Sequence, residues 1–241
     1  MTGRPSTAPA AHQLAFYASR RHDCPYLPDR DAVTLFADPD APMNNDVYGR
    51  LSEFGFRRSG RMIYRPACPG CSACIPVRIP AERFRGRRID RRVWRRNADL
   101  AVTATPPTYR EDHFRLYRRY LKARHAGGSM DTEDPAQYLE FLTSPWSDTV
   151  FYEFRLREAL LAVAVTDRLP DGLSAVYTFF DPDARARSLG QYAILWQVAE
   201  ARRLGLGAVY LGYWIEQCRK MSYKGKIRPL QMYRDGQWID L

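Results

Sequence analysis

Apolar and polar positions alternate at two spacings in the second half of the chain, and the spacings predict helices followed by strands. Residues 111–125 place apolar side chains every three or four positions, which predicts an amphipathic helix. A second helix is predicted just after it, because Asp134 suits an N-cap and Pro135 suits the first helical position. The chain therefore enters this region through two consecutive helices.

Runs rich in β-branched and aromatic residues follow, and they predict three strands. A Pro-Asp-Gly turn at 170–172 favours pairing of the last two strands as a hairpin. A mostly apolar stretch then predicts a buried helix that ends near Gly205, and one more strand follows. The predicted strands are 150–154, 160–166, 173–180 and 208–214, and the buried helix is 189–205.

The first third of the chain differs from the rest in composition and has shorter apolar runs. Residues 1–11 are rich in Pro, Ala, Ser and Thr, which predicts a disordered tail. Residues 12–80 consist of short apolar pieces broken by Pro, Gly and Asp, with one helix followed by an extended strand within 44–68. We predict a Cys-rich N-terminal domain at 12–100, which includes an arginine-rich run at 83–96, and a second domain at 101–241. The arginine-rich run and residues 102–110 are expected to link the two regions.

The order helix, helix, three strands, buried helix, strand is that of an acyltransferase-like α/β domain of the N-acetyltransferase type, with an antiparallel-rich mixed sheet. With 241 residues and 45% apolar content, the chain has enough material for a substantial core. No run approaches the length of a membrane span, and the first residues lack the apolar core of a signal peptide, so we predict a cytoplasmic protein without membrane contact.

Cysteines concentrate in the first third of the chain. Cys68, Cys71 and Cys74 form a Cys-x-x-Cys-x-x-Cys run, and Cys24 is available as a fourth sulfur. Because cytosolic thiols stay reduced, this pattern favours metal or redox chemistry over disulfides. Both tetrahedral zinc and an iron–sulfur cluster use such donors, so the spacing leaves the two open. Cys218 is expected to pack as a small apolar residue.

Positive charge dominates the chain and is concentrated in one segment. Lys and Arg number 37 against 27 Asp and Glu, and eight of the fourteen residues from Arg83 to Arg96 are Arg, with Phe84 and Trp94 between them. Arg offers a planar fork for phosphate oxygens, so the run favours RNA over a merely solvated basic face or an acidic lipid surface. The arginines predicted to contact an RNA backbone are Arg87, Arg88, Arg91, Arg92, Arg95 and Arg96.

One motif points elsewhere. Arg202, Gly205 and Gly207 spell R-x-x-G-x-G, the pyrophosphate-binding signature of acetyl-CoA-dependent N-acetyltransferases. That loop must open a helix so that backbone N–H groups face the anion, whereas here it follows a predicted helix and precedes a strand. The glycines are therefore expected to end the helix, and acetyl-CoA is not expected to be the acyl donor.

Several segments, in one order along nearly the whole chain, resemble the arginyl-tRNA–protein transferase superfamily and, within it, the bacterial aspartate/glutamate leucyltransferases. The resembling segments include CPYLPDR (24–30), YRPACPGCSACIPVR (64–78), LYRRYLKARH (116–125), VAVTDRLPDGLSAVYTFFDPDARARSLGQYAIL (163–195) and YLGYWIEQCRKMSYKGKIRP (210–229). The resemblance implies transfer of leucine from Leu-tRNA to proteins with N-terminal Asp or Glu, which marks them for N-degron degradation. It also implies an iron–sulfur cluster or zinc in the Cys-rich domain of some relatives, and arginine transfer in the longer eukaryotic form.

The resemblance also directs attention to a basic and aromatic cluster and to one strand. The residues expected near the acidic side chain or the terminal adenosine are Tyr213, Lys220, Tyr223 and Lys224, and those expected at the acceptor amine are Tyr177 and Asp181. The chemistry needs no cofactor, because the donor ester is already activated and positioning supplies most of the catalysis. A zinc-stapled RNA-binding protein without enzymatic activity and an acetyl-CoA-dependent acyltransferase remain the alternatives.

Overall fold

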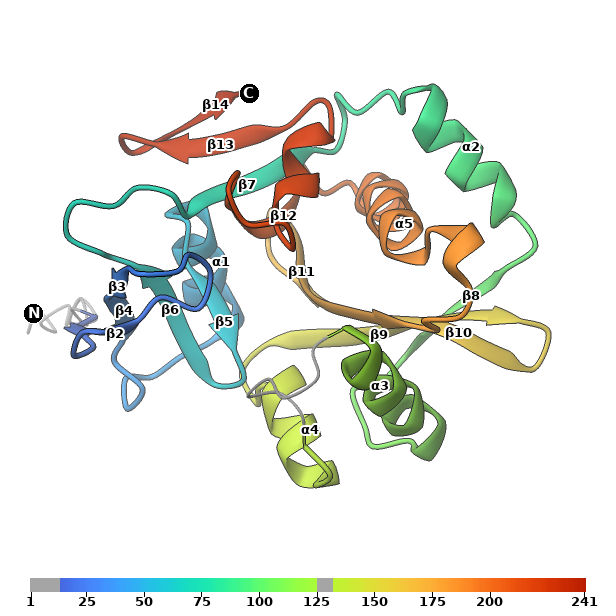
Figure 1. Ribbon diagram of the computed structural model, residues 1–241, viewed down its shortest axis with the longest axis horizontal. Coiled ribbons are helices and arrows are strands. Elements are labelled where there is room, and N and C mark those ends of the chain that lie inside the picture. The colour runs from blue at the N-terminus through green and yellow to red at the C-terminus, as the bar shows by residue number, and fades with distance from the viewer. Residues whose placement is uncertain (1–13, 125–131) are drawn as a thin grey trace, which may run out of the picture.

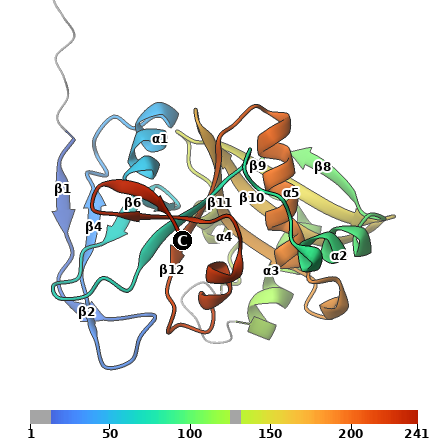
Figure 2. The same cartoon turned by 90° about the horizontal axis from the view of Figure 1, so that it is seen from above.

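The computed structural model describes residues 14–124 and 132–241, which form a small N-terminal sheet beside a large mixed sheet (Figures 1 and 2). The tail predicted at 1–11 lies outside the described residues. The small sheet has the strand order β1-β4-β6-β5 and packs with helix α1, and a two-stranded ribbon, β2-β3, adjoins it. These elements are β1 (Phe16–Ala18), β2 (His22–Asp23), β3 (Asp31–Ala32), β4 (Thr34–Ala37), α1 (Asn45–Glu53), β5 (Arg57–Ser59) and β6 (Met62–Pro66).

The large sheet has eight strands in the order β14-β13-β7-β12-β11-β10-β9-β8. All its neighbours pair antiparallel except β11 and β12, which run parallel. The strands are β7 (Ile75–Pro80), β8 (Ala101–Thr105), β9 (Asp148–Leu156), β10 (Ala159–Arg168), β11 (Gly172–Phe180), β12 (Ala208–Trp214), β13 (Gln231–Arg234) and β14 (Gln237–Asp240). The predicted α/β class with an antiparallel-rich, acyltransferase-like mixed sheet is confirmed.

Helices cover both faces of the large sheet (Figure 1). On one face α5 (Leu189–Arg203) packs on β10, β11 and β12, and α2 (Arg88–Arg96) lies on α5. On the other face α3 (Glu111–Arg124) and α4 (Pro135–Leu142) bury an aromatic-rich layer against the sheet. Two short 3₁₀ turns, η1 (Arg185–Arg187) and η2 (Ser222–Lys226), follow β11 and β12.

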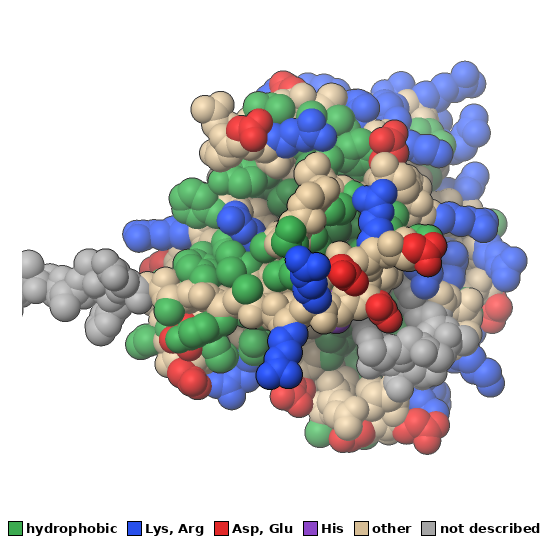
Figure 3. All heavy atoms as spheres, turned by 60° about the vertical axis from the view of Figure 1, so that its left-hand side comes forward, with side chains coloured by type: hydrophobic (Ala, Val, Ile, Leu, Met, Phe, Trp, Pro, Cys, Tyr) green, Lys and Arg blue, Asp and Glu red, His purple; other side chains and the backbone are tan. Residues whose placement is uncertain are grey.

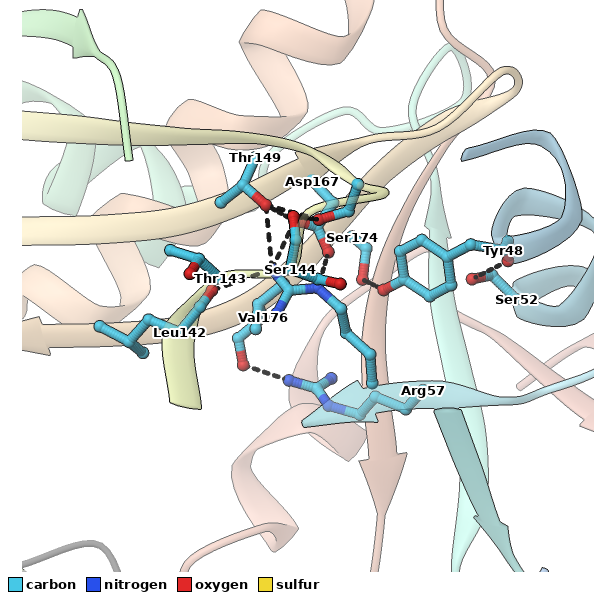
Figure 4. Close-up of polar contacts among 12 residues, drawn as sticks. Tyr48, Ser52, Arg57, Leu142, Thr143, Ser144, Thr149, Asp167, Ser174 and Val176 are labelled. Carbon is cyan, nitrogen blue, oxygen red and sulfur yellow. Dashed lines mark hydrogen bonds and ion pairs between the residues drawn. The ribbon is translucent and has the colours of Figure 1, made fainter. Parts of the chain in front are cut away.

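A buried ion pair ties the two sheets together. Arg58, on β5, is fully buried and donates two hydrogen bonds of 2.6 Å to the carboxylate of Asp167 on β10. The carboxylate also accepts from Thr149, and Tyr48 of α1 shares a 3.1 Å hydrogen bond with Ser174 of β11 (Figure 4). Because a buried charge without its partner is very costly, these contacts fix β5 against the large sheet.

The helices and strands predicted between residues 111 and 214 are confirmed, whereas β13 and β14 were not predicted. The strands β9 to β12 and the helices α3, α4 and α5 all form, Asp134 caps α4, and β10 pairs with β11 as a hairpin. Gly205, at φ +70°, ends α5 as expected, because the left-handed region favours glycine.

The predicted linker between the two parts is wrong. Residues 88–96 form the helix α2, because Asp90, Val93 and Asn97 recur at helical spacing and face α5, while the arginines occupy the outer side. Residues 101–105 form β8 at the edge of the large sheet. In addition, β7 is hydrogen-bonded between β12 and β13, so the large sheet contains strands from both sides of residue 100. A domain boundary at that residue stays a prediction.

No helix within the part of the chain that the structure describes is both long and apolar enough to span a bilayer.

Candidate functional site

The parallel strands β11 and β12 form a fork at the centre of the large sheet. They pair only from Gly172–Ser174 to Ala208–Tyr210, and β12 then makes a bulge before Gly212. Beyond this point both strands continue without pairing to each other, so the backbone groups of β11 that face β12 need other partners.

Arg57 supplies those partners from the neighbouring small sheet. Its guanidinium Nη2 donates to the carbonyl of Ala175 at 2.8 Å and to the carbonyl of Val176 (Figure 4). On the other side of the fork a Cβ atom at Gly212 would lie 1.9 Å from Arg57 Nη1, so only glycine, here at φ +71°, leaves room for the guanidinium. Arg57 has no carboxylate partner among the described residues. Its charge is therefore free to act on a ligand.

Lys224, in η2, is the second cation at the fork. Its side chain is 6% exposed, and Nζ donates a 2.7 Å hydrogen bond to the carbonyl of Tyr213. Burial, reinforced by the charge of Arg57, lowers the pKa of the Lys224 ammonium to about 7. No described carboxylate pairs with Lys224 either, so two cations lie close together with no acid between them.

Three tyrosines complete this group. Tyr213 on β12 donates to the backbone carbonyls of Gly55 and Tyr64, and burial raises its pKa well above the usual value. Tyr26 lies in the loop after Cys24, and burial raises its pKa to about 12. Tyr223 is half-exposed and lies within electrostatic range of Arg57. We call these residues the fork cluster: Tyr26, Arg57, Tyr213, Tyr223 and Lys224.

The structure brings three of the four predicted binding residues together and leaves the fourth at the edge. Tyr213, Tyr223 and Lys224 belong to the fork cluster, whereas Lys220 is exposed and makes no hydrogen bond with described residues. The sequence-based interpretation missed Arg57, although it stands next to Arg58 in the segment GFRRSG. Nothing in the local pattern distinguishes an arginine that inserts into a distant sheet from one on the surface.

Tyr177 and Asp181, the residues predicted at the acceptor amine, lie toward α3. Tyr177 is packed among aromatic rings, 6.3 Å from Tyr120 and 5.4 Å from Phe141, and its buried hydroxyl has no hydrogen-bond partner among the described residues. Asp181 forms a 2.9 Å ion pair with Arg119 of α3. The catalytic roles of Tyr177 and Asp181 therefore stay predictions.

The basic helix α2 presents its arginines to solvent. Asp90 accepts from the backbone N–H of Arg87 at 2.8 Å and from Gln191 of α5 at 2.8 Å, which anchors the helix start. Arg88, Arg92 and Arg95 are exposed and make no hydrogen bond or ion pair with described residues, and Trp94 is 40% exposed among them. Unpaired guanidinium groups around an exposed indole are suited to phosphates and bases. Lys and Arg side chains also line the upper and right-hand edges of the molecule in Figure 3.

The cysteines predicted as ligands gather at one place. Burial, followed by the neighbouring Cys24, Cys68, Cys71 and Cys218, raises the pKa of Cys74 to about 12. Cys218, expected only to pack as a small apolar residue, thus faces this cluster. Across residues 14–124 and 132–241, no group of three or more His, Cys, Asp and Glu side chains is arranged to hold a metal ion. The donor set itself suits a thiophilic ion, because a cation removes the mutual repulsion of thiolates.

The R-x-x-G-x-G segment follows α5 and precedes β12, as expected. Arg202 uses its guanidinium to hold the backbone carbonyls of Ala81 and Phe84, and the N–H of Gly207 donates to the carbonyl of Asp171. The motif is therefore occupied by contacts within the fold rather than presented at a helix N-terminus.

Comparisons with known proteins agree on one family. Residues 22–92 match the family model "Arginine-tRNA-protein transferase, N terminus", and residues 112–234 match "Arginine-tRNA-protein transferase, C terminus". The chain is 55% identical over 229 residues to an aspartate/glutamate leucyltransferase of Pseudomonas putida (strain W619), covering 95% of this chain and 97% of that protein. It is 53% identical over 229 residues, with the same coverage, to one of Pseudomonas aeruginosa (strain LESB58). Among solved structures, L-PGS from Bacillus licheniformis is 12% identical with a TM-score of 0.42, covering 68% of this chain and 50% of that chain.

Proposed function

The chain belongs to the arginine-tRNA-protein transferase family, and from this premise we propose that it transfers leucine from leucyl-tRNA to the α-amino group of proteins that begin with Asp or Glu. The observation that carries the acceptor specificity is the pair of cations at the fork, Arg57 and Lys224, which have no acidic partner among the described residues. The product is a protein whose first residue is leucine, the kind of end that marks a protein for degradation.

The reaction needs no enzyme nucleophile. The lone pair of the acceptor nitrogen attacks the ester carbonyl of the leucyl group, an amide bond forms, and the bond to the ribose oxygen breaks. The amine gives up a proton, and the ribose oxygen leaves as a hydroxyl after gaining one. An α-amino group has a pKa of about 8, so roughly a tenth of it is already the free amine at neutral pH. Positioning of the amine and the ester therefore supplies most of the rate.

The acidic side chain of the acceptor is proposed to bind between Arg57 and Lys224. The Arg57 guanidinium is already held by the carbonyls of Ala175 and Val176, so little conformational freedom is lost when it receives a carboxylate. A carboxylate near Lys224 favours the ammonium form, so binding raises the lowered pKa of Lys224 and takes up a proton. An Asn or Gln side chain offers no charge, which explains selection for the acid.

The tRNA is proposed to bind through the arginines of α2. The cysteine thiols are proposed to form a separate structural centre. Cys24, Cys68, Cys71 and Cys74 are proposed to hold a zinc ion or an iron–sulfur cluster. When bound, that centre crosslinks the loop of Tyr26 to the segment before β7, and it supplies no step of the transfer. A cytoplasmic location, where these thiols stay reduced, is part of the same proposal.

The proposal is tested by incubating the purified protein with leucyl-tRNA or arginyl-tRNA and short peptides that begin with Asp, Glu, Asn or Gln. Mass spectrometry then reports any added residue. Addition of leucine to the Asp and Glu peptides alone is expected. Addition of arginine instead, or no addition from either charged tRNA by protein that is folded and loaded with metal, contradicts the proposal.

A further inference from the structure

An arginine-rich depression lies outside both the fork cluster and the outer face of α2. It has a volume of about 460 Å³ and is lined by four arginines, by the side-chain carboxylate of Asp240 and by Leu241, the last residue of the sequence. Three of the arginines precede α2 or cap it, and the fourth follows η2 by two residues. We call this depression the arginine pocket: Arg83, Arg85, Arg87 and Arg228.

The side chain of Asp240 pairs with only one of these arginines. Asp240 accepts two hydrogen bonds from Arg83, at 3.0 and 2.7 Å. Arg87 pairs with Asp90 at 3.1 Å. Neither Arg85 nor Arg228 forms an ion pair with a carboxylate among the described residues, and both face the same cavity.

Both of these arginines are held in place by the backbone. Nη1 of Arg85 donates to the carbonyls of Glu82 and Phe84, at 2.6 and 3.1 Å. Nη1 of Arg228 donates to the carbonyls of Gly225 and Ile227, each at 2.7 Å. The remaining N–H groups of each guanidinium make no hydrogen bond with described residues. An anchored guanidinium with free donors is pre-organised for the oxygens of a phosphate.

The position of the pocket indicates which molecule supplies the phosphate group that binds there. Arg87 caps α2, the helix with the unpaired arginines, and Arg228 follows η2, which carries Lys224 of the fork cluster. A nucleic-acid strand that leaves α2 for the fork therefore passes the pocket. We propose that the arginine pocket binds a phosphodiester group in the single-stranded 3′ end of the tRNA and directs that end to the fork. This inference rests on the proposed function, because it presumes a tRNA substrate.

Binding of uncharged tRNA tests the inference separately from catalysis. The double variant Arg85→Gln/Arg228→Gln is compared with wild type and with Arg115→Gln, an exposed arginine of α3 on the opposite face of the sheet. Affinity is measured by fluorescence anisotropy over a range of salt concentrations, with full-length tRNA and with tRNA that lacks its unpaired 3′ nucleotides.

For full-length tRNA the double variant is expected to bind more weakly, with a log–log salt slope reduced by about 0.7 for each lost single-strand phosphate contact. For the shortened tRNA it is expected to match wild type, and Arg115→Gln is expected to match wild type with both. Equal weakening with both tRNAs, or no weakening with either, overturns the proposal. Inorganic phosphate could instead raise the unfolding temperature of wild type but not of the double variant, while both proteins bind tRNA equally well. That result would assign the pocket to free phosphate and would also overturn the proposal.

Wild-type protein that binds tRNA as described but transfers no leucine refutes the proposed function while leaving the pocket in place. Wild-type protein that transfers leucine, with a double variant that has unaltered tRNA affinity, refutes only the pocket.

Discussion

Replacing the buried Lys224 with Met is expected to stabilise the folded protein at acidic pH while weakening the preference for acidic acceptors. An unfolded lysine ionises with a pKa of about 10.4, whereas burial lowers the pKa of folded Lys224 to about 7. Between these values the unfolded chain holds a proton that the folded chain has released. The folded state therefore gains stability as the pH rises through this window.

The size of the effect follows from the same shift. Below pH 7 both states carry the charge, and the folded state bears the full cost of burying it, roughly 5 kcal/mol at 1.36 kcal/mol for each pKa unit. Met removes this cost but leaves the Tyr213 carbonyl without its 2.7 Å hydrogen bond, which costs about 1–3 kcal/mol. The net gain at about pH 6 is therefore roughly 2–4 kcal/mol, and it falls by roughly 3 kcal/mol on going to about pH 9.5.

Urea unfolding of wild type, Lys224→Met and the control Lys226→Met at the two pH values measures this difference. Lys226 is exposed in the same turn, so its replacement should leave the pH dependence as it is in wild type. A Lys224→Met protein whose stability relative to wild type is the same at both pH values would refute the assignment of a buried, charge-disfavoured lysine. So would a variant that is less stable than wild type at about pH 6.

Two further predictions concern the basic helix and the thiols. Changing Arg88, Arg92 and Arg95 to Gln should weaken tRNA binding and lower its log–log salt slope by up to about 0.9 for each lost phosphate contact. The control variant Arg115→Gln should bind tRNA as wild type does. An unaltered salt slope in the triple variant would show that α2 is not part of the tRNA interface. Cys71→Ser should lower the bound zinc or iron measured by mass spectrometry and lower the unfolding temperature, because a structural metal contributes on the order of 10 kcal/mol to folding. A variant with the same unfolding temperature and the same metal content as wild type would show that these thiols hold no metal.

The elements that the sequence predicted correctly are those in which local signals agree. The apolar stretches of β9, β10, β11 and α5 carry their own periodicity, and Asp134 and Gly205 mark helix ends by capping chemistry that acts within a few residues. Such signals need no knowledge of the tertiary structure.

The elements that escaped prediction depend on distant partners. The arginine run forms α2 because its buried polar residues bond to distant segments. Asp90 accepts a hydrogen bond from Gln191, 101 positions further along the chain, and Asn97 donates one to the backbone carbonyl of Arg187, 90 positions further along. The strand β7 is a short proline-bounded segment that becomes a strand between β12 and β13. Arg57 could not be distinguished from its neighbours, because its role arises where a strand of the small sheet meets a fork in the large one.

The central claim is that two cations at this fork select an acidic first residue, and the ratio of leucine transfer to Asp-starting and Asn-starting peptides tests it most directly. Kinetics are measured for wild type, Arg57→Gln and Arg57→Lys, with tRNA affinity and circular dichroism as checks on folding. Wild type is predicted to prefer the Asp peptide by roughly a hundredfold or more, Arg57→Lys to keep part of this preference, and Arg57→Gln to lose most of it through a raised KM for the Asp peptide. A folded Arg57→Gln protein with the full wild-type preference would contradict the account.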